Sequence, residues 1–278
     1  MIIVKLQGGL GNQMFQYALG RHLALLNNTS LILDTSLMVN DPNNRKLGLN
    51  QFNAVYKLNI PILQKLKKYI IPINEVTEKK PFNFDEEILN LRGNFVLTGS
   101  WQSEKYFTNI QDVIRQDFTI KKKLSDEFIN LSTNLKKINS IAIHVRHSDY
   151  ITNPSANSFH GICSPEYYQN AINYMIEHVS DPFFLIFSDD PQWSREKIKI
   201  KEHPVRYIDY ENPIRDAEYI SLMSCCRHHI IANSTFSWWW AWLCDNPKKL
   251  VIAPDPWLDS KKYEIIDLLP DNWIKIQK

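Results

Sequence analysis

Basic, acidic and imidazole side chains are concentrated in the segment 144–150, directly after the apolar run Ser140–Val145. An arginine at the end of a buried strand can donate two parallel hydrogen bonds to a phosphate, and its charge does not titrate away. His144 and Arg146 alternate along the strand, so both can face the same side. We predict that His144, Arg146 and Asp149 are catalytic residues around a diphosphate leaving group. The alternative is a surface pair of Arg146 and Asp149, which would stabilise the fold little.

A second polar segment follows the apolar run Phe183–Phe187. Ser188 and Asp189 come directly after it, and a carboxylate at a strand end can accept hydrogen bonds from a guanine edge or from ribose hydroxyls. We predict that both residues bind a nucleotide. Asp190 precedes Pro191, so we interpret Asp190 as the cap of the next helix.

A third segment carries small polar residues from an apolar run into a helix. The run at 229–232 leads into 233–237, where backbone N–H groups at a helix start can bind phosphate without lysine. The predicted phosphate-binding residues here are Asn233, Ser234, Thr235 and Ser237. At helical spacing, Trp238, Trp239 and Trp242 lie on one face, and we expect them in the core rather than in a sugar platform.

Glycines at the start of the chain stand where a first strand turns into a first helix, in the sequence Gly8-Gly-Leu-Gly-Asn-Gln13. Glycines let backbone amides approach a phosphate or sugar closely. The candidate binding residues in this turn are Gly9, Gly11, Asn12 and Gln13. Asp34 lies where the ribose-binding acid of a dinucleotide site belongs, but Met14 replaces the third glycine of that fingerprint. A tight turn without a ligand is an equal alternative for the motif alone.

These residues must be positioned by strands and helices that alternate along the chain. The second half shows the alternation clearly, which predicts a parallel sheet with ligands at the carboxyl ends of its strands. The predicted strands there are Ser140–Val145, Phe183–Phe187, Val205–Ile208, His229–Ala232 and Leu250–Ala253, and the predicted helices are Pro165–Val179, Pro191–Lys199, Arg215–Ser224 and Phe236–Asp245.

The first half begins in the same way, with predicted strands at Met1–Leu6, Leu31–Asp34 and Phe95–Thr98 and a helix at Gln13–Leu26. We place the domain boundary after residue 138, which gives two domains, 1–138 and 139–278. The segment Ile60–Ile70 reads as an amphipathic helix. We favour an ordinary surface helix there, and a helix that rests on anionic lipid is the alternative.

The composition excludes several classes of protein. The chain has 278 residues and a formal charge of +2, which argues against a protein that coats nucleic acid. The four cysteines form no C-x-x-C pair, and we expect reduced thiols. Neither a secretory signal nor an apolar run of about 18 residues is visible, so we expect a cytoplasmic protein. No Asp-x-Asp or H-E-x-x-H motif is present, and we expect no metal cofactor.

Five motifs in the expected order resemble the bacterial α-1,2-fucosyltransferases of glycosyltransferase family 11, over nearly the whole chain. The resemblance rests on the segments 8–17, 99–107, 144–150, 161–168 and 222–239. Two positions depart from the pattern of many relatives. His147-Ser148 stands where Arg-Gly is common, and Trp240 stands where Gly is common.

The resemblance implies an α/β fold of the GT-B type, with two Rossmann-like domains facing across a cleft. It also implies GDP-fucose as donor, inversion at the anomeric carbon, no metal, and a β-galactoside acceptor on the side of residues 1–138. The family's His-x-Arg-x-x-Asp motif falls on His144, Arg146 and Asp149, beside the donor diphosphate. Residues expected near the acceptor are Trp101, Glu104, His160 and Glu166.

The general base that accepts the proton of the acceptor hydroxyl is left open. His144, Asp149 and Glu166 are available, and the departing phosphate is a further alternative. Two other classes of function remain. A nicotinamide-dependent oxidoreductase would use the Gly9–Gly11 turn and Asp34, but it leaves Arg146 unexplained. A non-catalytic sugar-binding module would favour exposed aromatic platforms.

Overall fold

The computed structural model describes residues 1–41, 44–58, 72–147, 154–209 and 215–278. The chain divides into two compact units: unit 1 comprises Met1–Lys121 and Tyr263–Pro270, and unit 2 comprises Lys122–Lys262 and Asp271–Lys278. The sequence-based boundary after residue 138 places the helix Asp126–Lys137 with the first half. In the structure this helix belongs to unit 2, because Phe128 and Leu135 pack into that unit's core.

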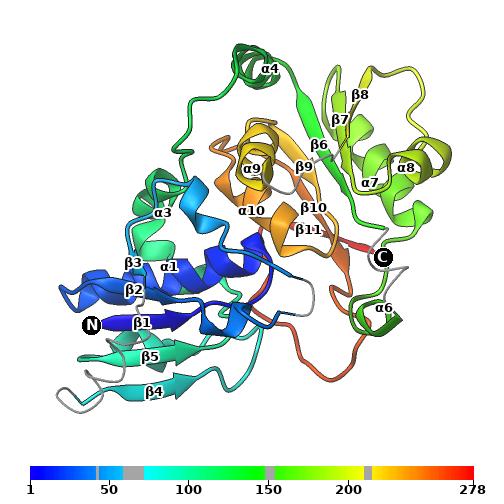
Figure 1. Ribbon diagram of the computed structural model, residues 1–278. Coiled ribbons are helices and arrows are strands. Elements are labelled where there is room, and N and C mark those ends of the chain that lie inside the picture. Colours follow the sequence, from blue (N-terminus) through cyan, green and yellow to red (C-terminus); the bar gives the residue numbers. More distant parts are fainter. Residues whose placement is uncertain (42–43, 59–71, 148–153, 210–214) are drawn as a thin grey trace. The chain divides into compact units, whose positions relative to one another are not determined.

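Unit 1 is built on a parallel five-stranded sheet (Figure 1). The strand order is β3-β2-β1-β5-β4, with β1 at Ile2–Lys5, β2 at Leu31–Asp34, β3 at Lys57–Leu58, β4 at Asn74–Thr77 and β5 at Phe95–Thr98. Its helices are α1 at Leu10–Leu26 and α3 at Gln111–Asp117, with short 3-10 helices at Ser36–Met38, Leu49–Gln51, Glu86–Asn90, Glu104–Tyr106 and Thr108–Ile110.

Helix α1 starts at a tight glycine turn and is buried along most of its length. Gly8 has a φ of +78°, a left-handed conformation that favours glycine, and Gly9 is the N-cap of α1. The Tyr17 hydroxyl donates to Asp117 at the end of α3 at 2.7 Å, and the Arg21 guanidinium pairs with the same carboxylate. These contacts join α1 to the end of α3.

Unit 2 is built on a parallel six-stranded sheet of order β11-β10-β9-β6-β7-β8. Its strands are β6 at Ser140–Val145, β7 at Phe183–Ser188, β8 at Val205–Asp209, β9 at His228–Ile230, β10 at Val251–Asp255 and β11 at Ile274–Gln277. Its helices are α4 at Asp126–Lys137, α6 at Pro154–His160, α7 at Pro165–His178, α8 at Pro191–Lys197, α9 at Asp216–Ser224 and α10 at Thr235–Leu243.

Alternate residues of β6 face two different helical layers. Ile141 and Ile143 pack with the buried side of α7, whereas Ala142 packs with α9 and α10. Both faces of the sheet are therefore covered, as the continuous apolar strands require. The confirmed fold class is α/β, with two units that each carry a parallel sheet. The tryptophans of α10 are buried as predicted.

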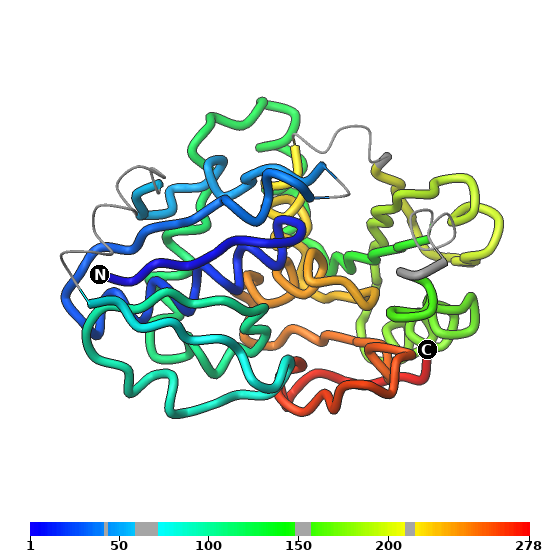
Figure 2. The backbone as a smooth tube through the Cα atoms, turned by 60° about the horizontal axis from the view of Figure 1, so that its bottom comes forward, coloured from blue at the N-terminus to red at the C-terminus, as the bar shows by residue number. Residues whose placement is uncertain are grey.

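The segment 263–270 belongs to unit 1, although strands of unit 2 precede and follow it in the sequence (Figure 2). Phe84 donates its backbone N–H to Asp267, and the Lys105 ammonium pairs with the same carboxylate at 2.5 Å. Leu268 is fully buried. In the described part of the chain, no helix combines the length and apolar character needed to cross a membrane. The segment Ile60–Ile70 lies outside the described residues, so its predicted helix is not assessed.

Candidate functional site

The polar segments that follow β7, β6 and β9 meet at one edge of the unit 2 sheet. Strand β6 pairs in parallel with β7 on one side and with β9 on the other. The carboxyl ends of parallel neighbours lie at the same edge, which is where open α/β sheets bind ligands. Arg146 follows β6, Asp189 follows β7, and the turn into α10 follows β9.

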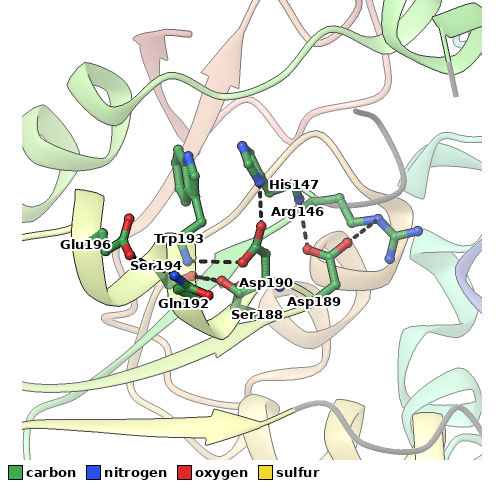
Figure 3. A network of polar contacts seen from close by, with 9 residues as sticks. All are labelled: Arg146, His147, Ser188, Asp189, Asp190, Gln192, Trp193, Ser194 and Glu196. Atoms are coloured by element: carbon green, nitrogen blue, oxygen red, sulfur yellow. Dashed lines mark hydrogen bonds and ion pairs between the residues drawn. The ribbon is translucent and has the colours of Figure 1, made fainter. Parts of the chain in front are cut away.

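Asp189 connects the ends of β6 and β7 (Figure 3). One carboxylate oxygen accepts the backbone N–H of His147 at 2.8 Å, and the other lies 3.5 Å from Nε of Arg146. The Arg146 side chain remains 30% exposed. A guanidinium at this strand end can donate two parallel hydrogen bonds to a phosphate.

Asp190 caps helix α8, in agreement with the sequence-based interpretation. Its carboxylate accepts the backbone N–H of Trp193 at 3.0 Å and contacts Nδ1 of His147 at 2.9 Å. These hydrogen bonds, that from Trp193 foremost, hold the pKa of Asp190 below its ordinary value. The His147 ring stacks on Trp193 with centroids 4.2 Å apart. Ser188, a predicted nucleotide ligand, is buried and accepts from the Asp190 N–H and the Ser194 hydroxyl.

His144 lies inside the core rather than at the edge of the sheet. Its ring is 1% exposed and stands edge-on to Trp240 at 4.9 Å, with Phe187 and Phe236 also in contact. Burial, with a smaller contribution from the Arg146 charge, holds the pKa of His144 well below its ordinary value, so the ring is neutral. This position, among aromatic side chains of the core, differs from the exposed strand end that the sequence suggested, and the catalytic role of His144 stays a prediction. Trp240, which stands where many relatives have glycine, packs its ring against His144.

The turn after β9 forms the capped start of α10. Ser234 is the N-cap, and its hydroxyl accepts the backbone N–H of Phe236 at 3.3 Å. Ser237 is fully buried and donates to the carbonyl of Ala232. Ser234 and Thr235 are partly exposed, so the helix N-terminus is accessible to an anion.

The Asn233 side chain is buried and hydrogen-bonds backbone carbonyls, including those at the end of α6 and directly after it. Its side-chain amide donates to the carbonyls of His160, Gly161 and Trp257 at 2.8 to 3.2 Å, and the residue is 2% exposed. Its amide hydrogens are thereby committed to the backbone. Asn233 and Ser237 therefore shape this edge of unit 2, while the exposed residues Ser234 and Thr235 remain the better ligand candidates.

In unit 1, side-chain amides fix the glycine turn. Gln13 is fully buried, donates to the carbonyls of Gly8 and Lys46, and accepts the N–H of Gly48. The Asn12 amide oxygen accepts from Gln102 at 3.1 Å. Gly9 and Gly11 lie at the start of α1, where the N–H groups of Asn12 and Gln13 donate to the carbonyl of Gly9, and the ligand-binding role of this turn stays a prediction.

Trp101 follows β5 in a left-handed conformation with a φ of +56°, and it is 1% exposed. Glu78, which the sequence analysis did not single out, holds it there. The two oxygens of Glu78 accept the backbone N–H groups of Ser100 and Trp101 at 2.7 and 2.9 Å. Burial raises the pKa of the Glu78 carboxyl. Glu104, also in unit 1, is partly exposed at the start of a 3-10 helix.

The remaining predicted acceptor residues, His160 and Glu166, belong to unit 2. His160 ends α6, and its carbonyl accepts from the Lys278 ammonium at 2.7 Å. Glu166 is exposed in the first turn of α7. Lys278, which the sequence analysis did not single out, also pairs with Asp259 at 2.7 Å. Asp149 lies outside the described residues, so its position is not assigned.

Metal-ligating side chains do not gather within the described segments, where no group of three or more His, Cys, Asp or Glu residues could hold an ion. The four cysteines are free thiols, as predicted. Burial raises the pKa of Cys163 to about 12, so this thiol stays protonated.

Parallel α/β units, with an arginine and a helix N-terminus at one strand edge, fit the class of α/β glycosyltransferases. The chain belongs to glycosyltransferase family 11, whose model matches residues 1–277. The family assignment establishes the chain as a glycosyltransferase. It also excludes the oxidoreductase and binding-module alternatives. The oxidoreductase alternative relied on Asp34 as a ribose-binding acid. In the structure this carboxylate is buried and accepts the N–H of Ser36 in its own turn.

Relatives of this chain include two Escherichia coli proteins. An α-1,2-colitosyltransferase is 32% identical over 100% of this chain and 99% of the relative. The O-antigen biosynthesis glycosyltransferase WbnK is 32% identical over 98% of this chain and 99% of its own length. Galactoside α-(1,2)-fucosyltransferase 2 of Bos taurus is 24% identical over 85% of this chain and 67% of its own.

Among solved structures, the α-1,6-fucosyltransferase NodZ soaked with GDP-fucose matches with a TM-score of 0.49 and 14% identity, over 87% of this chain and 92% of that one.

Proposed function

We propose that this glycosyltransferase moves L-fucose from GDP-β-L-fucose to the 2-hydroxyl of a terminal β-galactoside, forming an α-1,2 linkage with inversion. The family supports the reaction class, and the names of the relatives support the linkage. The observation that carries the proposal is the position of Arg146 and the α10 N-terminus after the neighbouring strands β6 and β9.

Transfer breaks the bond between the fucose anomeric carbon and the β-phosphate oxygen, while the galactose 2-oxygen forms the new bond from the opposite face. Negative charge grows on the departing GDP, so fixed donors aimed at the phosphates lower the barrier most. The Arg146 guanidinium and the N-terminus of α10 at Thr235 supply such groups in unit 2, while the Ser234 N–H donates to the carbonyl of Ala232. In unit 1, the α1 N-terminus at Gly9 and Gly11 is a further candidate, near fucose.

Charge neutralisation by these groups makes the reaction independent of a metal in this proposal. The proton of the galactose hydroxyl passes to a general base within hydrogen-bond reach. Asp149, Glu166 and a phosphate oxygen of the departing GDP are the candidates. We rank His144 behind them, because its ring is buried against Phe187, Phe236 and Trp240.

The donor sugar has a specific alternative. One of the E. coli relatives is a colitosyltransferase, and colitose is L-fucose without its 3-hydroxyl. The proposed partners of the phosphates, Arg146 and the α10 N-terminus, do not discriminate between the two donors, which share these phosphates. GDP-colitose is therefore the second candidate donor, and the family relatives favour synthesis of a surface glycan such as an O-antigen.

The test is incubation of the purified protein with lactose and either GDP-fucose or GDP-colitose, in the presence of EDTA. We expect an α-1,2-linked trisaccharide, identified by mass spectrometry and NMR, with GDP-fucose as the better donor. A higher kcat/KM with GDP-colitose would reassign the donor. Activity that appears only when Mg²⁺ or Mn²⁺ replaces EDTA would contradict metal independence. No transfer to any β-galactoside of a panel would contradict the proposed reaction.

A further inference from the structure

A cavity of about 640 Å³ lies in unit 1 at the carboxyl ends of β4 and β5. Its volume falls within the range of about 300 to 1,000 Å³ typical of small-ligand sites. Residues of β4 and the segment after it form one wall, the 3-10 helix Glu86–Asn90 contributes another, and Trp101 and Tyr106 complete the lining.

Two polar atoms of residues that line this cavity are buried without a hydrogen-bond partner among the described residues. They are the indole Nε1 of Trp101, a donor, and the amide Oδ1 of Asn83, an acceptor. Unpaired buried polar atoms are costly in a folded protein, so such a pair indicates a ligand that supplies the missing partners. Hydroxyl groups can supply both, because a hydroxyl oxygen accepts from an indole N–H and a hydroxyl hydrogen is donated to an amide oxygen.

The surrounding contacts hold both residues in place. Glu78 accepts the backbone N–H of Trp101, and a side chain at Gly99 would approach Cβ of Glu78 to 2.4 Å. The Asn83 amide nitrogen donates to the carbonyls of Pro81 and Glu264. These two hydrogen bonds fix the orientation of the amide, while its Oδ1 accepts no hydrogen bond from the described part of the chain. A site whose polar atoms are already fixed loses little conformational entropy when a ligand binds.

Aromatic rings and charge define the chemistry of the ligand. The Tyr106 ring packs against Phe84 and Trp101 with centroids 5.0 and 5.8 Å apart, which gives this lining apolar faces. The lining also carries five carboxyl groups, of Glu75, Glu78, Asp85, Glu86 and Glu87, against the two ammonium groups of Lys79 and Lys80. This excess of acidic groups disfavours a diphosphate, and the carboxyls do not form a metal-binding group in the described structure.

We propose that this cavity is the subsite for the neutral, hydroxyl-rich acceptor glycan, and that Trp101 Nε1 and Asn83 Oδ1 hydrogen-bond its hydroxyls. Apolar ring faces beside fixed polar atoms suit a sugar, which presents C–H groups and hydroxyls together. The assignment rests on the proposed function for the identity of the ligand as an acceptor. It adds Asn83 as a specificity residue and Glu78 as the positioning residue of Trp101.

The test combines NMR and kinetics on the full chain. The eight tryptophans give indole N–H signals, and the signal that is missing in Trp101→Phe belongs to Trp101. This variant keeps an aromatic ring but removes the donor. Thr77→Trp places a large side chain in the cavity from an exposed position on β4. Trp273→Phe, in the core of unit 2, is the matched control for loss of a buried indole.

On addition of lactose we expect the Trp101 indole signal to shift and the signal missing in Trp273→Phe to stay in place. Trp101→Phe should raise the KM for lactose about tenfold, the effect of one lost hydrogen bond to a buried group. Thr77→Trp should abolish saturation transfer to lactose. The Kd for GDP should stay within twofold of the wild-type value in all three variants.

The outcomes separate the subsite from the proposed reaction. If fucose transfer occurs and both cavity variants keep the wild-type KM for the acceptor, the subsite assignment is wrong and the reaction stands. If no β-galactoside of a panel is fucosylated but lactose shifts the Trp101 signal, the proposed reaction is wrong and the glycan subsite stands. If there is neither transfer nor a shift with any β-galactoside of the panel, both are overturned.

Discussion

The Asp189 carboxylate contacts two consecutive residues at the end of β6: one oxygen accepts the His147 N–H at 2.8 Å, and the other lies 3.5 Å from Nε of Arg146. A single side chain thus fixes both the backbone that carries Arg146 and one side of its guanidinium. Arg146 carries the positive charge, and Asp189 orients it. Replacing each residue in turn therefore tests the charge and its orientation separately.

Replacement of Arg146 tests the charge and its geometry. Arg146→Ala should lower kcat by about 10² to 10³, the magnitude seen when one preorganised donor is removed from a site of developing charge. Arg146→Lys keeps the charge but loses the planar fork, so we expect only partial recovery. Arg206→Ala removes an arginine paired with the exposed Glu127 and should leave kcat unchanged. Wild-type turnover in Arg146→Ala would refute the assigned role.

Replacement of Asp189 tests the orientation alone. Asp189→Asn keeps an oxygen for the His147 N–H but removes the charge that faces Arg146. We expect kcat/KM for the donor to fall about tenfold, less than in Arg146→Ala. If Asp189 acts through Arg146, the double variant should be no worse than Arg146→Ala alone, because the two effects are not independent. Additive losses would instead indicate that Asp189 contacts the donor directly.

Asn233→Asp tests the loop contacts in unit 2. The change replaces an amide that donates to three carbonyls with a carboxylate that repels them. We expect the free energy of unfolding to fall by about 3 kcal/mol, the upper part of the range for buried groups left without partners. Asn170→Asp makes the same change at an exposed position on α7 and should alter stability by less than about 0.5 kcal/mol. Urea denaturation followed by tryptophan fluorescence measures both.

Buried histidines make stability dependent on pH. Burial lowers the pKa of His228 to about 4, and its Nδ1 accepts the Leu250 N–H at 3.0 Å. The unfolded chain takes up a proton near pH 6.5 and the folded chain does not. Stability is therefore full above pH 6.5 and falls as the pH drops toward 4. The loss is about 1.4 kcal/mol per pH unit for each such group.

His228→Gln should reduce the change of the unfolding free energy with pH by the contribution of one histidine. This holds even if the substitution also changes the unfolding free energy at pH 7.5. His144 acts in the same direction, since its pKa is also lowered. Urea unfolding at pH 7.5, 6.5 and 5.5 measures the slope. An unchanged slope in His228→Gln would mean that the unfolded and folded chains bind this proton equally.

Strands of unit 2 were predictable because they are buried on both faces and read as continuous apolar runs. The predicted strand Ser140–Val145 has the same bounds in the structure, and Phe183–Phe187 differs by one residue. Strands with exposed side chains were missed. In β4, three of the four residues are exposed, and β11 alternates between partly exposed and exposed residues. These segments are strands because they pair with an inner strand of the sheet. The local composition of the segment does not encode that pairing.

Site residues were predictable by type, whereas their partners were not. Arg146 and Asp189 stand out as charged residues after apolar runs. The burial of His144 depends on Trp240, which lies far along the chain, and the role of Glu78 depends on a strand at 95–98. Spacing within one segment carries no signal for such contacts. The roles that require Asp149 stay predictions.

Unit 1 is discontinuous in sequence, because residues 263–270 return to it between two strands of unit 2. This has a consequence for recombining family members. A chimera with a single crossover at residue 121 would take residues 1–121 from one parent and residues 263–270 from the other. Phe84 and Lys105 would then meet the second parent's residue at position 267 in place of their own Asp267. An exchange of the whole of unit 1 between family members therefore has to move two separate stretches of the gene together.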